Sequence, residues 1–117
     1  ISFKNSYHGS TQGALSVMGS EYWRNAFRPL LPDVLHLEFN SSEALNEITD
    51  QTACVIAETV QGEAGIIAPL KDWMKALRKK CRETETILVL DEIQAGFGRT
   101  GKLWGFENFE IVPDILL

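Results

Sequence analysis

The feature that most constrains the fold is a pair of short apolar runs on either side of one amphipathic segment. The runs, residues 54–57 (CVIA) and 87–90 (ILVL), do not alternate with polar residues, which is typical of parallel strands buried on both faces. Between them, apolar residues recur at helical spacing, and Pro69 stands where a first helical turn tolerates it. The apolar side comprises Leu70, Trp73, Met74, Leu77 and Cys81, and the polar side comprises Lys71, Asp72, Lys75, Arg78, Lys79 and Arg82. The pattern predicts a βαβ unit whose right-handed crossover brings the carboxyl ends of both strands to one sheet edge.

The rest of the chain continues this alternation of strands and helices. Because there is no repeat, low-complexity tract or linker, an α/β fold without an internal domain boundary is predicted for residues 1–117. Strands are expected at 1–4, 34–39 and 114–117, and helices at 10–19, capped by Ser10 or Thr11, and at 41–48. Since natural termini are usually polar, the strand-like runs at both ends suggest a segment of a longer protein.

Charge and cysteine content narrow the functional classes. With 11 basic and 16 acidic residues the formal net charge is −5, which gives no electrostatic attraction to nucleic acid or to an anionic membrane. No apolar run approaches the ~20 residues of a membrane span, and the first residues lack a signal-peptide pattern, so a cytoplasmic protein is expected. Cys54 and Cys81 lie in apolar patterns without a CxxC motif or nearby histidine ligands, which predicts core thiols and no metal site.

Acidic residues follow both apolar runs. Glu58 comes after the first run and Asp91 with Glu92 after the second, so carboxylates are expected at the edge where ligands bind in open α/β sheets. A buried carboxylate normally has a cationic partner, such as a ligand cation or a metal. Alternatively, Glu58 and Asp91 cap helix N-termini or accept hydrogen bonds from loop amides.

The glycine-rich loop after Asp91 contains two phosphate-binding patterns that do not hold. Gly96-x-Gly98-x-x-Gly101 has the spacing of a dinucleotide fingerprint, but the residues that follow it show no helical period. Residues 96–102 also approach a P-loop, yet Leu103 stands where Ser or Thr would hold magnesium. Neither pattern therefore indicates a nucleotide site.

Four ordered motifs resemble the class III aminotransferases. They are residues 7–11 (YHGST), 58–65 (ETVQGEAG), 90–101 (LDEIQAGFGRTG) with Trp104, and 113–115 (PDI). The resemblance implies the large cofactor-binding domain of fold type I, a mostly parallel sheet with flanking helices, in a homodimer. It also implies pyridoxal phosphate as cofactor and transfer of an amino group between an amine or ω-amino acid and a 2-oxo acid.

The resemblance also implies roles for particular residues. Asp91 matches the acid that pairs with the protonated pyridine nitrogen of the cofactor, which keeps the ring electron-accepting. Gln94 matches the side chain that binds the ring oxygen, and Tyr7 matches the aromatic residue that stacks on the ring. Glu63 matches the acid that pairs with an arginine and so switches the site between an ω-amino donor and a 2-oxo acid. Glu58 is expected to support the same edge in a role that the sequence does not define.

Simpler interpretations stay open at this stage. Tyr7 fits a loop aromatic that plugs the core, Glu63 a solvated turn acid, and Gln94 an ordinary loop amide. His8 is interpreted as a packing or hydrogen-bonding loop residue, and Glu92 is assigned no role of its own.

The resemblance further implies groups that these 117 residues do not contain. No lysine fits the family's covalent cofactor ligand, which would follow residues 113–115, and the phosphate-binding turn and the substrate-binding arginine are also missing. The chain alone is therefore expected to be inactive. The alternatives are another pyridoxal phosphate enzyme of the same fold, a racemase or decarboxylase, or a stand-alone nucleotide-binding βαβ module.

Overall fold

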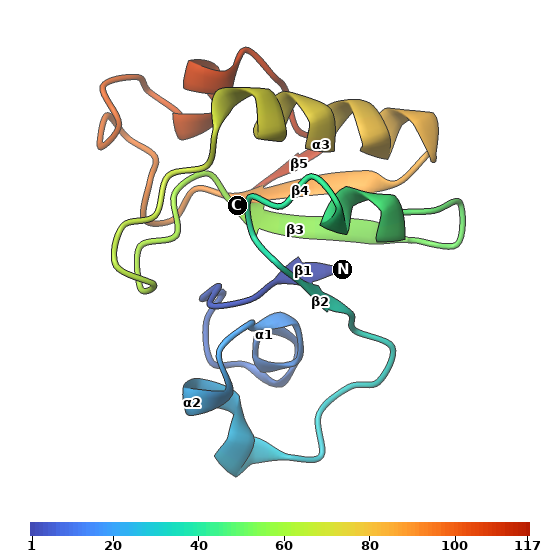
Figure 1. The fold of residues 1–117 in the computed structure, drawn as a ribbon. Coiled ribbons are helices and arrows are strands. Elements are labelled where there is room, and N and C mark those ends of the chain that lie inside the picture. Colours follow the sequence, from blue (N-terminus) through green and yellow to red (C-terminus); the bar gives the residue numbers. More distant parts are fainter.

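A parallel sheet forms the centre of the computed structural model, which describes all residues 1–117 (Figure 1). Strand β3 (Cys54–Glu58) pairs in parallel with β4 (Ile87–Asp91), and β4 pairs in parallel with β5 (Ile115–Leu116). Helix α3 (Lys71–Glu83) connects β3 to β4. The predicted βαβ unit is confirmed, and each of its two strands extends one residue further than expected, to include the terminal acid.

Two short strands form a separate two-stranded sheet on the other side of β3. Strand β1 (Ser2–Phe3) pairs in parallel with β2 (His36–Leu37), and both are shorter than the predicted strands. The amino group of Ile1 donates to the carbonyl of Cys54 at 2.9 Å, and the N–H of Ile56 donates to the carbonyl of Ile1 at 3.0 Å. These two hydrogen bonds link the residue before β1 to β3, so the small sheet β1-β2 lies beside the three-stranded sheet β3-β4-β5 (Figure 1).

The helices lie at two ends of this arrangement. Figure 1 shows α3 alongside β4 and β5, whereas α1 (Gln12–Val17) and α2 (Glu21–Arg24) lie beyond β1 and β2. Of the two proposed caps, Thr11 is the one used, since its hydroxyl accepts a hydrogen bond from the N–H of Ala14 at 3.4 Å. No helix in the chain combines the length and apolar character needed to cross a membrane.

Short 3₁₀ turns replace or supplement the remaining predicted helices. The segment predicted as a helix at 41–48 is the 3₁₀ turn η2 (Ala44–Glu47). Two further turns, η1 (Asn25–Phe27) and η3 (Gly105–Phe109), were not predicted, and neither was α2. The glycine loop leads into η3 and no α-helix follows it, which agrees with the rejection of the dinucleotide fingerprint.

The core lies between α3 and one face of the sheet. It includes Trp73, Met74, Leu77 and Cys81 from the helix and Val55, Ala57, Leu88 and Leu90 from the strands. Full burial of each Leu, Val or Met side chain among them stabilises the fold by roughly 1.5–3 kcal/mol before chain entropy is subtracted. On the opposite face of the sheet, Ile56 and Val89 are half-buried. The strands were predicted to be buried on both faces, but only the face that packs against α3 is fully buried.

Three residues of the predicted pattern differ in the structure. Leu70 has extended backbone and precedes α3, so its side chain does not join the apolar stripe and is 66% exposed. Cys54 is exposed at the start of β3, so the prediction that it is a core thiol is wrong. Cys81 is buried as predicted, and its burial raises the pKa of the thiol to about 11. Arg78, expected on the solvated side, is buried because its guanidinium pairs with Asp114 at 2.6 Å.

Candidate functional site

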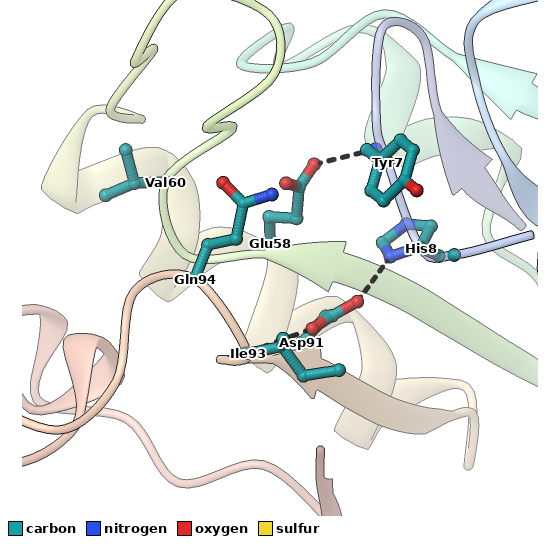
Figure 2. Close-up of a pocket in the computed structure, with 8 residues that line it drawn as sticks. Tyr7, His8, Glu58, Val60, Asp91, Ile93 and Gln94 are labelled. Atoms are coloured by element: carbon teal, nitrogen blue, oxygen red, sulfur yellow. Dashed lines mark hydrogen bonds and ion pairs between the residues drawn. The ribbon is translucent and has the colours of Figure 1, made fainter. Parts of the chain in front are cut away.

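The carboxyl ends of β3 and β4 meet at the expected edge of the sheet. Glu58 and Asp91 are the last residues of these strands and are direct partners in the parallel register. A cavity of about 120 Å³ opens beside them, and the loop after β1 forms its far wall (Figure 2). Its lining consists of Tyr7, His8, Gly9, Glu58, Val60, Asp91, Ile93 and Gln94. The structure therefore brings together four of the five predicted site residues.

Both oxygens of the Asp91 carboxylate are held in place. Oδ2 lies 2.8 Å from Nδ1 of His8, and Oδ1 accepts a hydrogen bond from the N–H of Ile93 at 3.1 Å (Figure 2). Asp91 is 6% exposed, so its orientation is fixed by these two contacts more than by water. Because each carboxylate oxygen has two lone pairs, the group can still accept a further hydrogen bond from the cavity.

His8 is the direct partner of Asp91, and the sequence did not predict this contact. Its side chain is 1% exposed, and its second ring nitrogen, Nε2, is buried without a hydrogen-bond partner. The interpretation of His8 as a hydrogen-bonding residue is correct, but its partner is the central acid of the site. Its place directly after Tyr7 was the available signal, since the chain that brings one to the cavity also brings the other.

Glu58 lies deep in the same wall. The residue is 4% exposed, and its carboxylate accepts a hydrogen bond from the N–H of Tyr7 at 3.2 Å (Figure 2). Burial raises the pKa of Glu58 to about 7, although the Tyr7 N–H and the nearby His8 favour the charged form. Glu58 can therefore hold or release a proton near neutral pH, next to a second carboxyl group at Asp91.

Tyr7 forms an aromatic wall of the cavity, and a second ring packs against it. Trp23 of α2 packs against Tyr7 with the ring centroids 5.7 Å apart and the planes at 78°. Trp23 in turn contacts Tyr22 at 4.9 Å and 85°. Edge-to-face contacts of this kind restrict the plane of each ring. The unpredicted helix α2 thus contributes to the site by supporting Tyr7.

Glu63 is the one predicted site residue that does not line this cavity. It lies on the turn after β3, where its carboxylate accepts a hydrogen bond from Nε2 of Gln94 at 3.2 Å. Gln94 lines the cavity and therefore connects Glu63 to it. Both side chains are exposed in this chain.

Glu92 fixes the loop that follows the glycine-rich segment. Its two carboxylate oxygens each accept a backbone N–H at 2.8 Å, one from Gly105 and one from Phe106. A Cβ at Gly105 would lie 2.5 Å from the Thr59 hydroxyl, so only glycine permits this approach. The buried Glu92 thereby ties the end of the loop to the sheet edge, a role that its position beside Asp91 did not reveal.

Comparison with known proteins identifies the family. The structure is that of an α/β protein with a candidate ligand site at its strand ends. The family model described as aminotransferase class-III matches residues 1–117, and the chain belongs to this family.

Individual relatives agree with this assignment. The chain is 50% identical over 116 residues to a LysW-aminoadipate semialdehyde/glutamate semialdehyde transaminase of Sulfolobus acidocaldarius. This match covers 99% of the present chain and 30% of that protein. It is 45% identical over 117 residues to an acetylornithine aminotransferase of Caldanaerobacter subterraneus, with the same coverage. The chain thus spans about 30% of the length of these relatives.

Solved structures of aminotransferases have the same fold. An ornithine aminotransferase from Toxoplasma gondii superposes with a TM-score of 0.92 at 33% identity, over 99% of this chain and 28% of that one. An amine transaminase from an uncultivated Pseudomonas species, in its PLP-bound form, gives 0.91 at 29% identity, over 98% of this chain and 31% of that one. The predicted α/β fold of type I is confirmed by these similarities.

Proposed function

We propose that the chain forms part of the large, cofactor-binding domain of a pyridoxal phosphate-dependent aminotransferase. The complete protein moves an amino group between an amine or ω-amino acid and a 2-oxo acid. The observation that carries this proposal is the buried Asp91 carboxylate, oriented by His8 and by the Ile93 N–H at the edge of a cavity.

The residues around this cavity fit the cofactor. A protonated ring nitrogen needs an oriented acceptor, which Asp91 supplies, and an aromatic ring needs a flat wall, which Tyr7 supplies. A ring oxygen needs a donor, and Gln94 carries an amide nitrogen at the same cavity. The donor set therefore has one group of the right chemistry for each polar atom of the ring.

Each residue has a definite task in this scheme. When bound, pyridoxal phosphate supplies a ring that accepts the electron pair left when the substrate carbon loses its proton. Asp91 holds a proton at the ring nitrogen, and His8 prevents its carboxylate from rotating away. Tyr7 fixes the plane of the ring, and Glu58 holds the backbone of Tyr7 in place by accepting its N–H.

The proposal extends to assembly and location. The glycine loop carries Phe97, which is 81% exposed, and Leu103, which is 59% exposed, and these side chains offer a contact for a second copy in a homodimer. Both cysteines are free thiols, which is consistent with a cytoplasmic enzyme.

The substitution Asp91→Asn in the complete protein tests the proposal. Asparagine keeps the shape of the side chain but not its charge, so the ring nitrogen loses its anionic partner. We expect turnover of amino donor and 2-oxo acid to fall by several orders of magnitude, toward the upper end of the ~10²–10⁴-fold contribution of a positioned acid or base.

A matched control is Asp72→Asn, at an exposed position in the first turn of α3, which should leave turnover unchanged. Steady-state assays should be paired with absorbance spectra of the bound cofactor in all three proteins. Full turnover in the Asp91→Asn protein would exclude the proposed role.

A further inference from the structure

Helix α2, whose Trp23 packs against Tyr7, is too short to hold itself in place. It is a single turn, Glu21–Arg24, and none of its residues is buried. An isolated helix of this length does not persist in water, and little apolar burial is available to stabilise it. The position of Trp23 therefore depends on contacts that the polar side chains of the same turn make with other elements.

The guanidinium of Arg24 ties α2 to two other elements. Its side chain is 12% exposed, and its Nε lies 3.2 Å from a carboxylate oxygen of Glu21 within the turn. Nη1 donates to the carbonyl of Met18, the residue directly after α1, at 2.9 Å. Nη1 also lies 2.6 Å from Nε2 of His36, on β2. Arg24 thus joins α2 to α1 and to β2, one position along the chain from Trp23.

The contact with His36 requires a neutral imidazole ring. Arg24 has only donors and keeps its charge in proteins, so Nε2 of His36 has to be the acceptor and the ring proton lies on Nδ1. Burial, followed by the charge of Arg24, lowers the pKa of His36 below its ordinary value. A protonated ring offers Arg24 no lone pair and places a second cation against the first. Protonation of His36 therefore releases the contact.

The other groups around His36 leave this direction unchanged. The Glu21 carboxylate and the Met18 carbonyl favour the charged ring, whereas the amino group of Ile1 favours the neutral ring. Glu21 is shared between two guanidinium groups, since it pairs with Arg28 at 2.8 Å as well as with Arg24. The remaining charged side chains, which line a shallow cavity with His36 and neutralise each other in an ion pair, are Lys4 and Glu38.

We propose that Arg24 is a positioning residue that holds the aromatic wall of the site, and that His36 makes this hold depend on pH. Neutral His36 keeps α2 in place, with Trp23 against Tyr7, and protonated His36 releases it. Resting on the proposed function, this means that the ring of Tyr7 is less confined at low pH and that cofactor binding weakens there. The hold is complete above the ordinary pKa of histidine and is lost as pH falls through the pKa of His36 in the folded protein.

The first test is the titration of His36 in the complete, cofactor-free protein, measured by NMR of isotope-labelled histidine. The signal is assigned by its absence from the His36→Gln protein. We expect a midpoint below the ordinary value of about 6.5, and Arg24→Met should raise it by about 0.5 pH units or more because the adjoining charge is gone.

Arg28→Met is the matched control for this titration, because it removes the same charge from a residue that does not contact His36. It should shift the midpoint less than Arg24→Met does. Equal shifts in the two variants, or a parent midpoint at or above the ordinary value, would overturn the inference. A signal that does not titrate while the protein stays folded would also overturn it, since the contact would then never be released.

The second test follows the aromatic wall by near-ultraviolet circular dichroism, again in the cofactor-free complete protein. The difference spectrum between the parent and Trp23→Leu reports the contact of Trp23 with Tyr7. We expect this difference to disappear at a pH about one unit below the His36 midpoint, where most of the rings are protonated. The glutamine of His36→Gln does not titrate, and its amide oxygen can accept from Arg24, so this protein should keep the parent's high-pH spectrum at both pH values.

Equilibrium dialysis with pyridoxal phosphate then measures the effect on the site. Over the same pH change, the parent should lose about 2- to 10-fold in affinity relative to His36→Gln, the range expected for one aromatic contact. The same pH dependence of the spectrum and of the affinity in both proteins would refute the role of His36. If the parent binds no pyridoxal phosphate at either pH, the proposed function fails, whereas the titration and the spectra still decide the role of Arg24.

Discussion

Glu58→Gln should change how the stability of the protein depends on pH. Burial raises the pKa of Glu58 from 4.5 to about 7, so the folded protein keeps a proton that the unfolded chain releases. Between these two values stability therefore falls as pH rises, and the fall is complete above the folded pKa. Since one pKa unit corresponds to about 1.36 kcal/mol, the total loss amounts to at most about 3 kcal/mol.

Glutamine has nearly the same shape, cannot ionise, and keeps an oxygen that can accept the Tyr7 N–H. The Glu58→Gln protein should consequently match the parent below about pH 4 and exceed its free energy of unfolding by up to about 3 kcal/mol at pH 8. Urea unfolding of the cofactor-free complete protein at both pH values measures this difference. Glu83→Gln, an exposed position, provides the control. An identical loss of stability between pH 4 and 8 in the parent and the Glu58→Gln protein would refute the reasoning.

Two further predictions concern the supports of the fold and of the site. Arg78→Leu removes the buried partner of Asp114 and should lower the free energy of unfolding by about 1–3 kcal/mol. The loss stays in this range because Asp114 is partly exposed and can be hydrated in the variant. Urea unfolding measures the loss. Trp23→Leu removes the edge-to-face support of Tyr7, which is worth roughly 0.5–1.5 kcal/mol, and should weaken cofactor binding about 2- to 10-fold in equilibrium dialysis. Tyr22→Leu, which alters a ring that contacts Trp23, should have a smaller effect, and equal effects of the two substitutions would contradict the prediction.

The central βαβ unit was predictable because its signals are local and strong. The two apolar runs and the 13-residue helix between them carry their periodicity in consecutive residues, and the parallel crossover then places Glu58 beside Asp91. Tyr7 and Gln94 were assigned through the family resemblance, and the structure brings both to the cavity.

The remaining features depend on contacts between distant residues. The burial of Arg78 requires Asp114, 36 positions away, so a helical pattern alone assigns Arg78 to solvent. The contact of His8 with Asp91 spans 83 positions. The contact of Glu92 with Gly105 depends on the path by which the chain comes back to the sheet edge after the glycine loop. Short elements were also hard to predict, since α2 has four residues and too few turns for a detectable period.

The backbone pairing of Ile1 with β3 has a geometric consequence for the site. Parallel strands advance about 3.3 Å per residue, and side chains return to the same face only every second residue. A slip of β1 along β3 by two positions would thus carry the loop with Tyr7 and His8 by roughly 7 Å, beyond reach of Asp91. The alignment of the aromatic wall with the acid is therefore a property of strand register, and mutations that loosen the first three residues should misalign the site without altering any group that touches a ligand.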